Sequence, residues 1–344
     1  MAARATIPSV DTRRQLKVEH VASADALARV QELLRPAVAR AIRWYFRRAA
    51  AGVARVLQTG DRDALLQAAP AWRARAKRFA VPSATAMAQA LDGVRLSPVQ
   101  ETNVSASWIE SDGFDRKGVL IYVPGGSFVV GRTPRLTALI ARIAKAARVR
   151  ACIIDYRLAP EHPCPAAVED VERAVRDLVG GGQAPKRIAV IAESAGAAIA
   201  LSAVQRLRDS GVDLACVCLL SPWTDLALTG LSVVTRSLTN QSAMTMEFPA
   251  ICAHLYLQGL SPFDPVASPV YGDLGGLPPL LIHTSRTDGL HDDARNLSER
   301  AFRAGSDVTL RIWPRGTHAF EQGFNAQSER AIKDAGAFIR EKLA

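Results

Sequence analysis

A serine, an aspartate and a histidine each follow a short apolar stretch of this sequence. They are Ser194, Asp288 and His318, which come after the apolar residues 187–191, 279–284 and 308–313 respectively. A serine hydroxyl becomes a nucleophile when an imidazole takes its proton, and the imidazole needs a carboxylate on its other nitrogen. Each residue alone has an ordinary alternative role, such as a helix cap or a surface side chain. Their joint placement predicts nucleophilic catalysis.

The serine lies within residues 192–196, which read Ala-Glu-Ser-Ala-Gly between an apolar run and an alanine-rich segment. This pattern predicts a strand, a sharp turn and a helix. Small neighbours permit the strained backbone of such a turn, and the N-terminus of the following helix favours negative charge. The alternative is an ordinary strand-to-helix turn in which Ser194 caps the helix. The turn therefore indicates a nucleophile only in combination with Asp288 and His318.

A second loop could stabilise the negative charge that forms when a serine attacks a carbonyl. Residues 124–128 read Pro-Gly-Gly-Ser-Phe and directly follow the apolar run 119–123. Adjacent glycines let the backbone approach a substrate oxygen closely and direct N–H groups at it. Each such donor contributes about 3 to 4 kcal/mol of transition-state stabilisation. The alternative is a simple Gly-Gly turn, but the nearby nucleophile candidate favours the functional interpretation.

Strand-like and helix-like stretches alternate after residue 98. The expected strands are 102–110, 119–123, 150–155, 187–191, 215–220, 279–284 and 308–313, and the expected helices are 136–147, 166–178, 197–209, 292–304 and 328–343. Such alternation predicts a mostly parallel sheet covered by helices on both faces, and ligands bind beyond the carboxyl ends of its strands. Residues 222–278 interrupt the alternation, contain one clear helix at 244–258, and predict a lid element.

The composition is that of a globular protein with 344 residues, 49% of them hydrophobic. No apolar run reaches the roughly 18 to 20 residues that a membrane-spanning helix needs, and no secretion signal is recognisable. The five cysteines are scattered, and we interpret them as reduced core residues of a cytoplasmic protein. No Cys/His spacing resembles a zinc site. Because a Ser-His-Asp triad needs only water, we expect neither a metal nor an organic cofactor.

The excess of positive over negative charge lies entirely in the N-terminal region. Residues 1–90 hold sixteen Lys and Arg against six Asp and Glu, which accounts for the entire net charge of +10. The remaining residues 91–344 are therefore neutral in balance. Because no recognition motif accompanies the basic region, the sequence does not favour nucleic acid as a partner.

The basic region itself is predicted to be largely helical. Residues 1–20 are polar and expected to be loosely ordered, whereas 23–80 show a helical pattern that Pro36 interrupts. We interpret these helices as a lid with its aromatic residues packed inward and its arginines in water. The arginine-rich stretches expected on solvated faces are residues 47–48 and the group Arg73, Arg75, Lys77 and Arg78. A basic amphipathic helix lying on an anionic membrane is the alternative.

Several motifs together resemble the hormone-sensitive-lipase-like, or bacterial family IV, esterases and lipases of the α/β-hydrolase superfamily. They are the Gly-Gly loop at 125–126, the string 155–163, the turn at 192–196, the segments 221–226 and 267–269, and the loops of Asp288 and His318. The chain order Ser, Asp, His is also the one found in that fold. The resemblance covers about residues 100–344, and the string at 155–163 (Asp-Tyr-Arg-Leu-Ala-Pro-Glu-His-Pro) is its most specific part.

The resemblance implies an α/β-hydrolase fold, with a mostly parallel eight-stranded sheet flanked by helices and a helical cap. Residues 1–90 would form the N-terminal cap region and 91–344 the catalytic domain, with a further cap-type insertion at about 222–278.

The resemblance also implies roles for individual residues. Ser194 would be the nucleophile, His318 its base and Asp288 the residue that orients the base. The backbone N–H groups of Gly126, Ser127 and Ala195 would donate to the oxyanion, with Gly125 shaping that loop. Structural roles would fall to Arg157, Glu161, His162 and Asp225.

This chain departs from the family pattern at two motifs and in the cap. The family usually has His-Gly-Gly-Gly where this chain has Pro124, two glycines and Ser127. It usually has Gly-Asp-Ser-Ala-Gly at residues 192–196, where this chain has Ala-Glu-Ser-Ala-Gly. The backbone donors survive these changes. Pro124 removes the imidazole that braces the loop in the family, and Ser127 adds a side chain near the acyl site. The arginine-rich cap matches no specific pattern, so it leaves the substrate open.

The implied function is a serine carboxylesterase that hydrolyses short- to medium-chain esters, with lactones as a further option, through an acyl-serine intermediate. The partner would be a small-molecule ester. Two alternatives stay open: a non-catalytic small-molecule-binding protein on the same fold, and a membrane-associated lipase acting on longer-chain lipid esters. Peripheral membrane contact through the basic N-terminal helices and a homodimer are likewise open at this stage.

Overall fold

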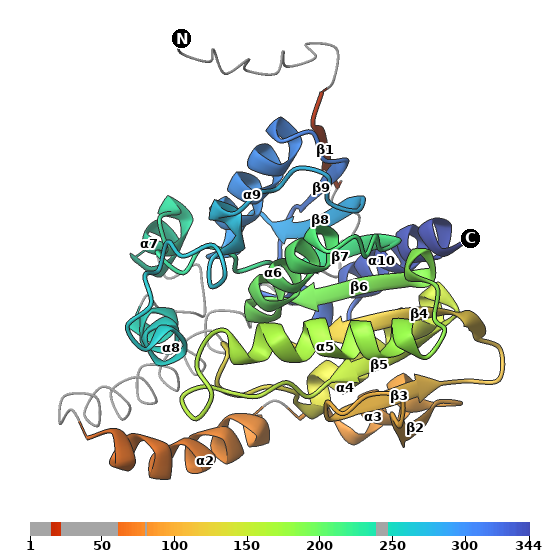
Figure 1. The fold of residues 1–344 in the computed structure, drawn as a ribbon, viewed down its shortest axis with the longest axis horizontal. Helices are drawn as coiled ribbons and strands as arrows, with labels where there is room; N and C mark the ends of the chain where they lie inside the picture. The colour runs from red at the N-terminus through yellow and green to blue at the C-terminus, as the bar shows by residue number, and fades with distance from the viewer. Residues whose placement is uncertain (1–14, 22–60, 80, 239–246) are drawn as a thin grey trace.

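The computed structural model describes residues 15–21, 61–79, 81–238 and 247–344. The chain forms one central sheet with helices on both faces (Figure 1). The strands are β1 (Lys17–His20), β2 (Arg95–Pro98), β3 (Ala106–Glu110), β4 (Asp115–Val123), β5 (Val149–Ile154), β6 (Ile188–Glu193), β7 (Cys216–Leu220), β8 (Leu280–Ser285) and β9 (Val308–Trp313). This architecture confirms the predicted fold class.

The sheet has the order β1-β9-β8-β7-β6-β4-β5-β3-β2. The strands from β4 to β9 run parallel, and β3 is antiparallel to both β5 and β2. Residues 119–123 of β4, residues 188–192 of β6 and the whole of β7 are apolar and buried, as expected for strands with helices on both faces. The carboxyl ends of β6, β8 and β9 therefore lie at one edge, where Ser194, Asp288 and His318 follow them.

The sheet has nine strands rather than the expected eight. Two strands were not among those expected individually: β2, which pairs with β3, and β1, which lies at residues expected to be loosely ordered and pairs in parallel with β9. The sequence of β1, Lys-Val-Glu-His, is too polar to predict a strand. Backbone pairing with β9 and an ion pair between Glu19 and Arg311 hold it in place. Both contacts depend on a partner far away in the chain, so the local pattern could not reveal them.

Helices cover the sheet in two layers (Figure 1). The helices are α2 (Arg62–Phe79), α3 (Ala84–Leu91), α4 (Pro134–Ala147), α5 (Ala166–Gly180), α6 (Ala195–Asp209), α7 (Leu231–Leu238), α8 (Glu247–Leu257), α9 (His291–Arg303) and α10 (Ala326–Leu343). The helices α4 and α10 pack on one face, whereas α5, α6 and α9 pack on the other. The five helices expected in the catalytic region are confirmed with ends shifted by two residues or fewer.

The segment 222–278 contains two helices among its described residues. The expected helix at 244–258 corresponds to α8, but α7 was not expected. The sequence of α7, Leu-Ser-Val-Val-Thr-Arg-Ser-Leu, is short and rich in β-branched residues, which gives a weak helical pattern. The side chain of Ser232 on α7 donates a hydrogen bond to the Gly289 carbonyl, at 2.7 Å. This contact places α7 beside the loop that carries Asp288.

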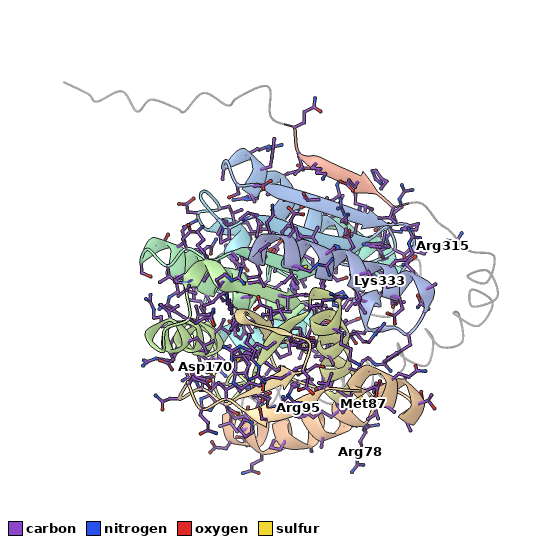
Figure 2. All side chains as sticks on the ribbon, turned by 90° about the vertical axis from the view of Figure 1, so that its right-hand side faces the viewer. Arg78, Met87, Arg95, Asp170, Arg315 and Lys333 are labelled. Carbon is purple, nitrogen blue, oxygen red and sulfur yellow. The ribbon has the colours of Figure 1, made fainter. Side chains whose placement is uncertain are left out.

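The expectation that Arg73 lies on a solvated face is wrong. Its side chain is only 16% exposed, and its guanidinium forms a bidentate ion pair with Glu161. It also donates to the carbonyls of Val129 and Ala159, at 2.6 and 2.8 Å. By contrast, Arg78 on the same helix is exposed and points away from the protein (Figure 2). Periodicity alone could not distinguish these two arginines, because the partners of Arg73 come from other segments.

The other predictions for the N-terminal region fall mostly outside the described residues. These include residues 23–60 and the arginines at 47–48, whereas 62–79 form α2 as part of the expected helical region. None of the helices in the described ranges has the length and apolar character that a membrane crossing requires. The cysteines expected in core strands, Cys152, Cys216 and Cys218, are buried in β5 and β7.

Candidate active site

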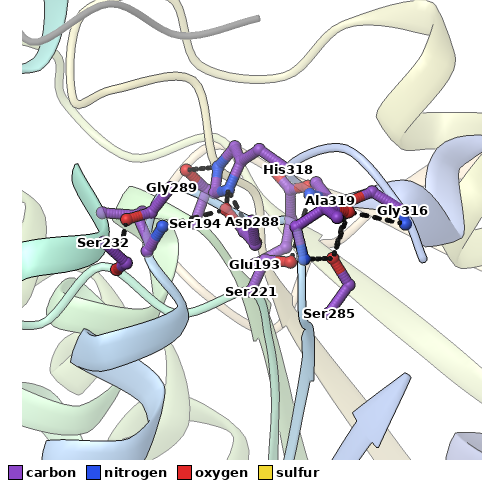
Figure 3. A network of polar contacts seen from close by, with 12 residues as sticks. Glu193, Ser194, Ser221, Ser232, Ser285, Asp288, Gly289, Gly316, His318 and Ala319 are labelled. Carbon is purple, nitrogen blue, oxygen red and sulfur yellow. Dashed lines mark hydrogen bonds and ion pairs between the residues drawn. The ribbon is translucent and has the colours of Figure 1, made fainter. Parts of the chain in front are cut away.

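The three residues singled out by their chemistry lie within hydrogen-bonding distance of one another (Figure 3). The Nε2 atom of His318 is 2.7 Å from the Ser194 hydroxyl oxygen. On its other side, Nδ1 of His318 is 3.1 Å from Oδ1 and 3.3 Å from Oδ2 of Asp288. The tautomer with the proton on Nδ1 lets His318 donate to Asp288 and accept from Ser194. The geometry is that of a nucleophile, a base and a carboxylate in series.

The turn at Ser194 is strained and tightly packed. Ser194 joins β6 to α6 with φ 52° and ψ −127°, a conformation that L-residues rarely adopt. Its N–H donates to the Leu220 carbonyl, and its own carbonyl accepts from the Trp223 N–H, both at 3.0 Å. A Cβ on Gly196 would lie 2.3 Å from the Val123 carbonyl oxygen. Glycine at 196 is therefore required for α6 to approach β4 and hold the turn.

Asp288 is completely buried at the end of β8. Burial by itself raises its pKa, but the charge and hydrogen bond of His318 lower it, as do the Leu290 N–H and the Ser221 hydroxyl. The net pKa of Asp288 lies below its ordinary value, so the group is ionised at neutral pH. Asp288 can therefore fix the orientation of His318 and stabilise its protonated form.

His318 lies in the loop after β9, and its side chain is 17% exposed. Burial by itself lowers its pKa, but Asp288 raises it through both charge and hydrogen bonding, and Glu193 and Glu321 raise it further. The net pKa of His318 is above its ordinary value. A base with such a pKa accepts a proton readily near neutral pH, which suits general base catalysis.

The loops of Asp288 and His318 are also tied to each other. The hydroxyls of Ser285 and Thr287 each donate to the Gly316 carbonyl at 2.6 Å. The Gly316 N–H in turn donates to the Thr287 hydroxyl oxygen at 3.1 Å. Figure 3 shows Ser285 and Gly316 beside Ala319 in this network. The distance between the carboxylate and the imidazole therefore depends on hydrogen bonds between the two loops as well as on the strands beneath them.

Ser221 is a residue of this site that the sequence analysis did not single out. It follows β7, is completely buried and has φ 45°. Its oxygen accepts from the Ala319 N–H at 3.1 Å, and its hydroxyl is hydrogen-bonded to Asp288. Ser221 thus connects the carboxylate to the loop of His318. The only signal in the sequence was its place at the start of the motif 221–226, which had no role assigned to its serine.

The Gly-Gly loop, residues 124–128, follows β4 and faces the turn at residues 192–196, the nucleophile turn. Gly126, Ser127 and Phe128 all have positive φ, at 103°, 53° and 65°. A Cβ at Gly126 would lie 2.8 Å from the Gly131 nitrogen, so glycine is needed there. Ser127 adopts left-handed backbone although it has a Cβ, and its hydroxyl contacts the thiol of Cys252 on α8. The side chain that replaces a family glycine is thereby engaged with the 222–278 segment.

This loop is braced by side chains from distant parts of the chain. The Tyr156 hydroxyl donates to the Pro124 carbonyl at 2.7 Å and approaches the Gly125 carbonyl at 3.2 Å. At the other end of the loop, Arg73 on α2 donates to the Val129 carbonyl. These contacts supply bracing in a chain that has Pro124 in place of the histidine usual in the family.

Aromatic side chains pack behind the loop. Phe128 stacks on Tyr256 of α8 with ring centroids 4.1 Å apart and contacts Trp223 at 5.2 Å. All three rings are fully buried. They join the Gly-Gly loop, the motif after β7 and α8 into one apolar unit. The 222–278 segment is therefore packed directly against the site.

Three of the residues expected to be structural, Glu161, Asp225 and Arg157, make structural side-chain contacts, and Glu161 makes its contact with Arg73. The carboxylate of Asp225 accepts hydrogen bonds from the N–H groups of Ala227 and Thr229, which shapes the turn after β7. Arg157 pairs with Asp170 of α5. In the described ranges, no cluster of three or more His, Cys, Asp or Glu residues could hold a metal ion.

Comparison with known protein families identifies the family of this chain. Residues 120–322 match the family described as alpha/beta hydrolase fold. The chain belongs to the alpha/beta hydrolase family. Its matched region begins in β4 and ends just after His318, so it contains Ser194, Asp288 and the Gly-Gly loop.

Individual relatives narrow the resemblance to esterases. An acetyl-hydrolase from Streptomyces hygroscopicus is 40% identical over 240 residues, which covers 69% of this chain and 79% of that protein. The solved structure of an esterase from the bacterial hormone-sensitive lipase family is 33% identical, with a TM-score of 0.72, covering 87% of this chain and 98% of that one. The structure of EstE5 is 32% identical with a TM-score of 0.74, covering 80% and 91%. These similarities confirm the predicted family, and this alpha/beta hydrolase is a carboxylic ester hydrolase.

Proposed function

We propose that this alpha/beta hydrolase cleaves carboxylic esters through an acyl-serine intermediate formed on Ser194. The observation that carries the proposal is the 2.7 Å contact between His318 Nε2 and the Ser194 hydroxyl, with Asp288 at 3.1 Å on the other ring nitrogen. His318 takes the hydroxyl proton as Ser194 attacks the ester carbonyl. It then gives that proton to the leaving alcohol. Water, activated in the same way, releases the acid and restores Ser194.

The backbone N–H groups of Gly126, Ser127 and Ala195 form the oxyanion hole in this proposal, with Gly125 shaping the loop. Within the described ranges these three N–H groups have no hydrogen-bond acceptor of their own. Ala195 is the first residue of α6, so its N–H also lies at the positive end of the helix dipole. Donors already held by the fold need no reorganisation when charge develops on the substrate oxygen.

Short- to medium-chain esters are the proposed substrates, with lactones as a further option. Support comes from the acetyl-hydrolase and esterases among the relatives and from the three buried rings next to the Gly-Gly loop. In the same proposal, residues 1–90 serve as a cap region on a catalytic domain of 91–344. The link between Arg73 and residues 129–161 favours that arrangement. A membrane contact of the N-terminal helices, a homodimer and a cytoplasmic location stay predictions.

The decisive experiment is an acyl-length series of p-nitrophenyl esters with the wild type, Ser194→Ala and His318→Ala. We expect acetate to butyrate to be the best substrates and either substitution to lower kcat by about four orders of magnitude or more. Turnover retained in Ser194→Ala would refute the triad. A preference for long acyl chains would favour the lipase alternative, and failure to react with a fluorophosphonate probe would favour a non-catalytic binding protein.

A further inference from the structure

Glu193, the residue directly before the nucleophile, contacts both loops that flank Ser194. It is the last residue of β6 and is only 2% exposed. Its Oε2 atom accepts a hydrogen bond from the side-chain amide of Gln322 at 2.6 Å. Its carboxylate also accepts from the backbone N–H of Gly125. One buried side chain therefore connects the nucleophile turn, the Gly-Gly loop and the segment that follows His318.

The contact with Gly125 is unusually close and explains the residue found there. A Cβ at Gly125 would lie 2.0 Å from Oε1 of Glu193 and 2.9 Å from its backbone oxygen. Any other residue at 125 would push the carboxylate away or displace the loop. The φ of Gly125 is not positive, so the glycine serves close approach rather than backbone conformation. The Gly-Gly loop is thus built to receive the Glu193 carboxylate.

Charged and titratable groups surround Glu193. His318 and Glu321 in the segment after β9 interact with it electrostatically, as do Tyr122 on β4 and Tyr156 after β5. Burial raises the pKa of Glu193 to about 7, although the charge of His318 and two hydrogen bonds oppose this rise. In return, the negative charge of Glu193 raises the pKa of His318. Figure 3 shows Glu193 close to Ser194 and His318.

We propose that Glu193 is a positioning residue. Its ionised carboxylate aligns the Gly-Gly loop and the segment after His318 on Ser194. It also stabilises the protonated His318 that forms when Ser194 attacks. The proposal rests on the proposed function, because it assumes that Ser194 and His318 react. Glu193 itself touches no reacting atom. Its effect passes through the N–H groups of the loop and through the electrostatic field at His318.

The substitution Glu193→Gln separates charge from shape. Its side-chain oxygen can still accept from the Gly125 N–H, and its amide can donate to Gln322 once the Gln322 amide flips. We expect kcat at high pH to fall about tenfold, because the charged hydrogen-bond acceptor between the Gly-Gly loop and Gln322 is lost. We expect KM to stay within about a factor of two, since ground-state binding is untouched. The acid limb of the kcat/KM profile should move to lower pH, because protonated His318 loses a stabilising charge.

Glu321→Gln is the matched control. Glu321 is as buried as Glu193 and also raises the pKa of His318. Its carboxylate faces His283, whose Nδ1 lies 3.6 Å from Oε1, rather than the Gly-Gly loop. It should therefore move the acid limb to lower pH while leaving kcat at high pH unchanged. An equal loss of kcat in both variants would overturn the positioning role, since charge alone would then explain the result.

A swapped pair provides the rescue test. Glu193→Gln combined with Gln322→Glu returns one carboxylate and one amide to the same junction, with their positions exchanged. We expect this double variant to recover most of the kcat lost in Glu193→Gln. If Glu193→Gln fails to fold in a denaturant titration, Gln322→Ala decides instead, with an expected loss in kcat of about threefold. An unchanged kcat in whichever variant is folded overturns the proposal.

The failure of this inference can be told from a failure of the proposed function. An inactive Ser194→Ala together with a Glu193→Gln of normal kcat and normal acid limb would leave the triad intact and remove only the role of Glu193. An active Ser194→Ala would instead remove the proposed function.

Discussion

The nucleophile turn and the Gly-Gly loop lie side by side but are held in different ways. The turn at Ser194 depends on small residues within a few positions: Gly196 lies against the backbone of β4, and Ala195 begins α6. The Gly-Gly loop depends on Tyr156, Arg73 and Glu193, which come from elsewhere in the chain. A backbone clash cannot relax, whereas a side-chain brace can be lost in part. The turn should therefore fail abruptly and the loop gradually when each is altered.

The largest effect is expected at the turn. Gly196→Ala would place a Cβ 2.3 Å from the Val123 oxygen and 2.7 Å from the Pro124 oxygen, both of them backbone atoms. We expect the free energy of unfolding to fall by about 3 kcal/mol or more, with ester hydrolysis nearly abolished. A denaturant titration and a p-nitrophenyl butyrate assay measure both quantities.

Gly180→Ala is the control for that substitution. Gly180 ends α5, and nothing lies within 4 Å of its added Cβ. It should leave activity unchanged and stability equal or slightly higher, because alanine suits a helix better than glycine does. Equal stability of the two variants would show that the close packing at the turn is not essential.

The next largest effect is expected where the loop is braced by α2. Arg73→Ala removes the ion pair with Glu161 and the bonds to the Val129 and Ala159 carbonyls. We expect kcat to fall about tenfold while the protein stays folded, because the loop loses a charged anchor but no backbone clash arises. Arg78→Ala, on the exposed side of α2, should match the wild type. If the two variants behave alike, α2 does not support the loop.

A smaller effect is expected from the other brace. Tyr156→Phe removes the hydroxyl that donates to the Pro124 carbonyl at 2.7 Å but keeps the ring. We expect kcat/KM to fall about fivefold, which corresponds to one lost hydrogen bond of about 1 kcal/mol. Tyr271→Phe serves as the control, since its hydroxyl bonds Asp225 at 3.0 Å, away from the loop. A Tyr156→Phe enzyme with full activity would mean that Pro124 needs no replacement for the missing histidine.

The midpoint of the pH profile should distinguish the two regions, independently of the height of the profile. Because His318 must be neutral to take the serine proton and its pKa is raised, kcat/KM should fall as pH drops through a midpoint above the ordinary value of 6.5. Arg73→Ala should lower the whole profile but leave this midpoint in place, since Arg73 bonds Glu161 and not the imidazole. A shifted midpoint in that variant would mean that the loop and the base are coupled electrostatically.

Most of the sheet and its helices could be predicted because their signals are local. Residues 119–123 of β4, 188–192 of β6 and all of β7 are continuous apolar runs, and the amphipathic helices between the strands have a clear period. The strands β1 and β2 and the helices α3 and α7 were not predicted. The strand β1 is polar and exists through pairing with β9, and α7 is short with β-branched residues.

The site divides in the same way. Ser194, Asp288 and His318 were recognisable because each follows a parallel strand, and such strands end at one edge of the sheet. Ser221 and Glu193 were not assigned a role, and Arg73 was placed on the wrong side of its helix. Their function lies in hydrogen bonds that no short pattern encodes.

The sequence by itself determined the fold class, the three residues proposed to react and the small residues of the nucleophile turn. Those features follow from hydrophobic period, strand order and local steric limits, which operate over a few positions. Only the tertiary structure decided how the Gly-Gly loop is held and which charges surround the base. Tyr156 and Pro124 are 32 positions apart in the sequence, and Arg73 and Val129 are 56 apart. Glu193 and Gln322 are 129 positions apart. Such pairs meet only after the sheet has assembled and its helices have packed.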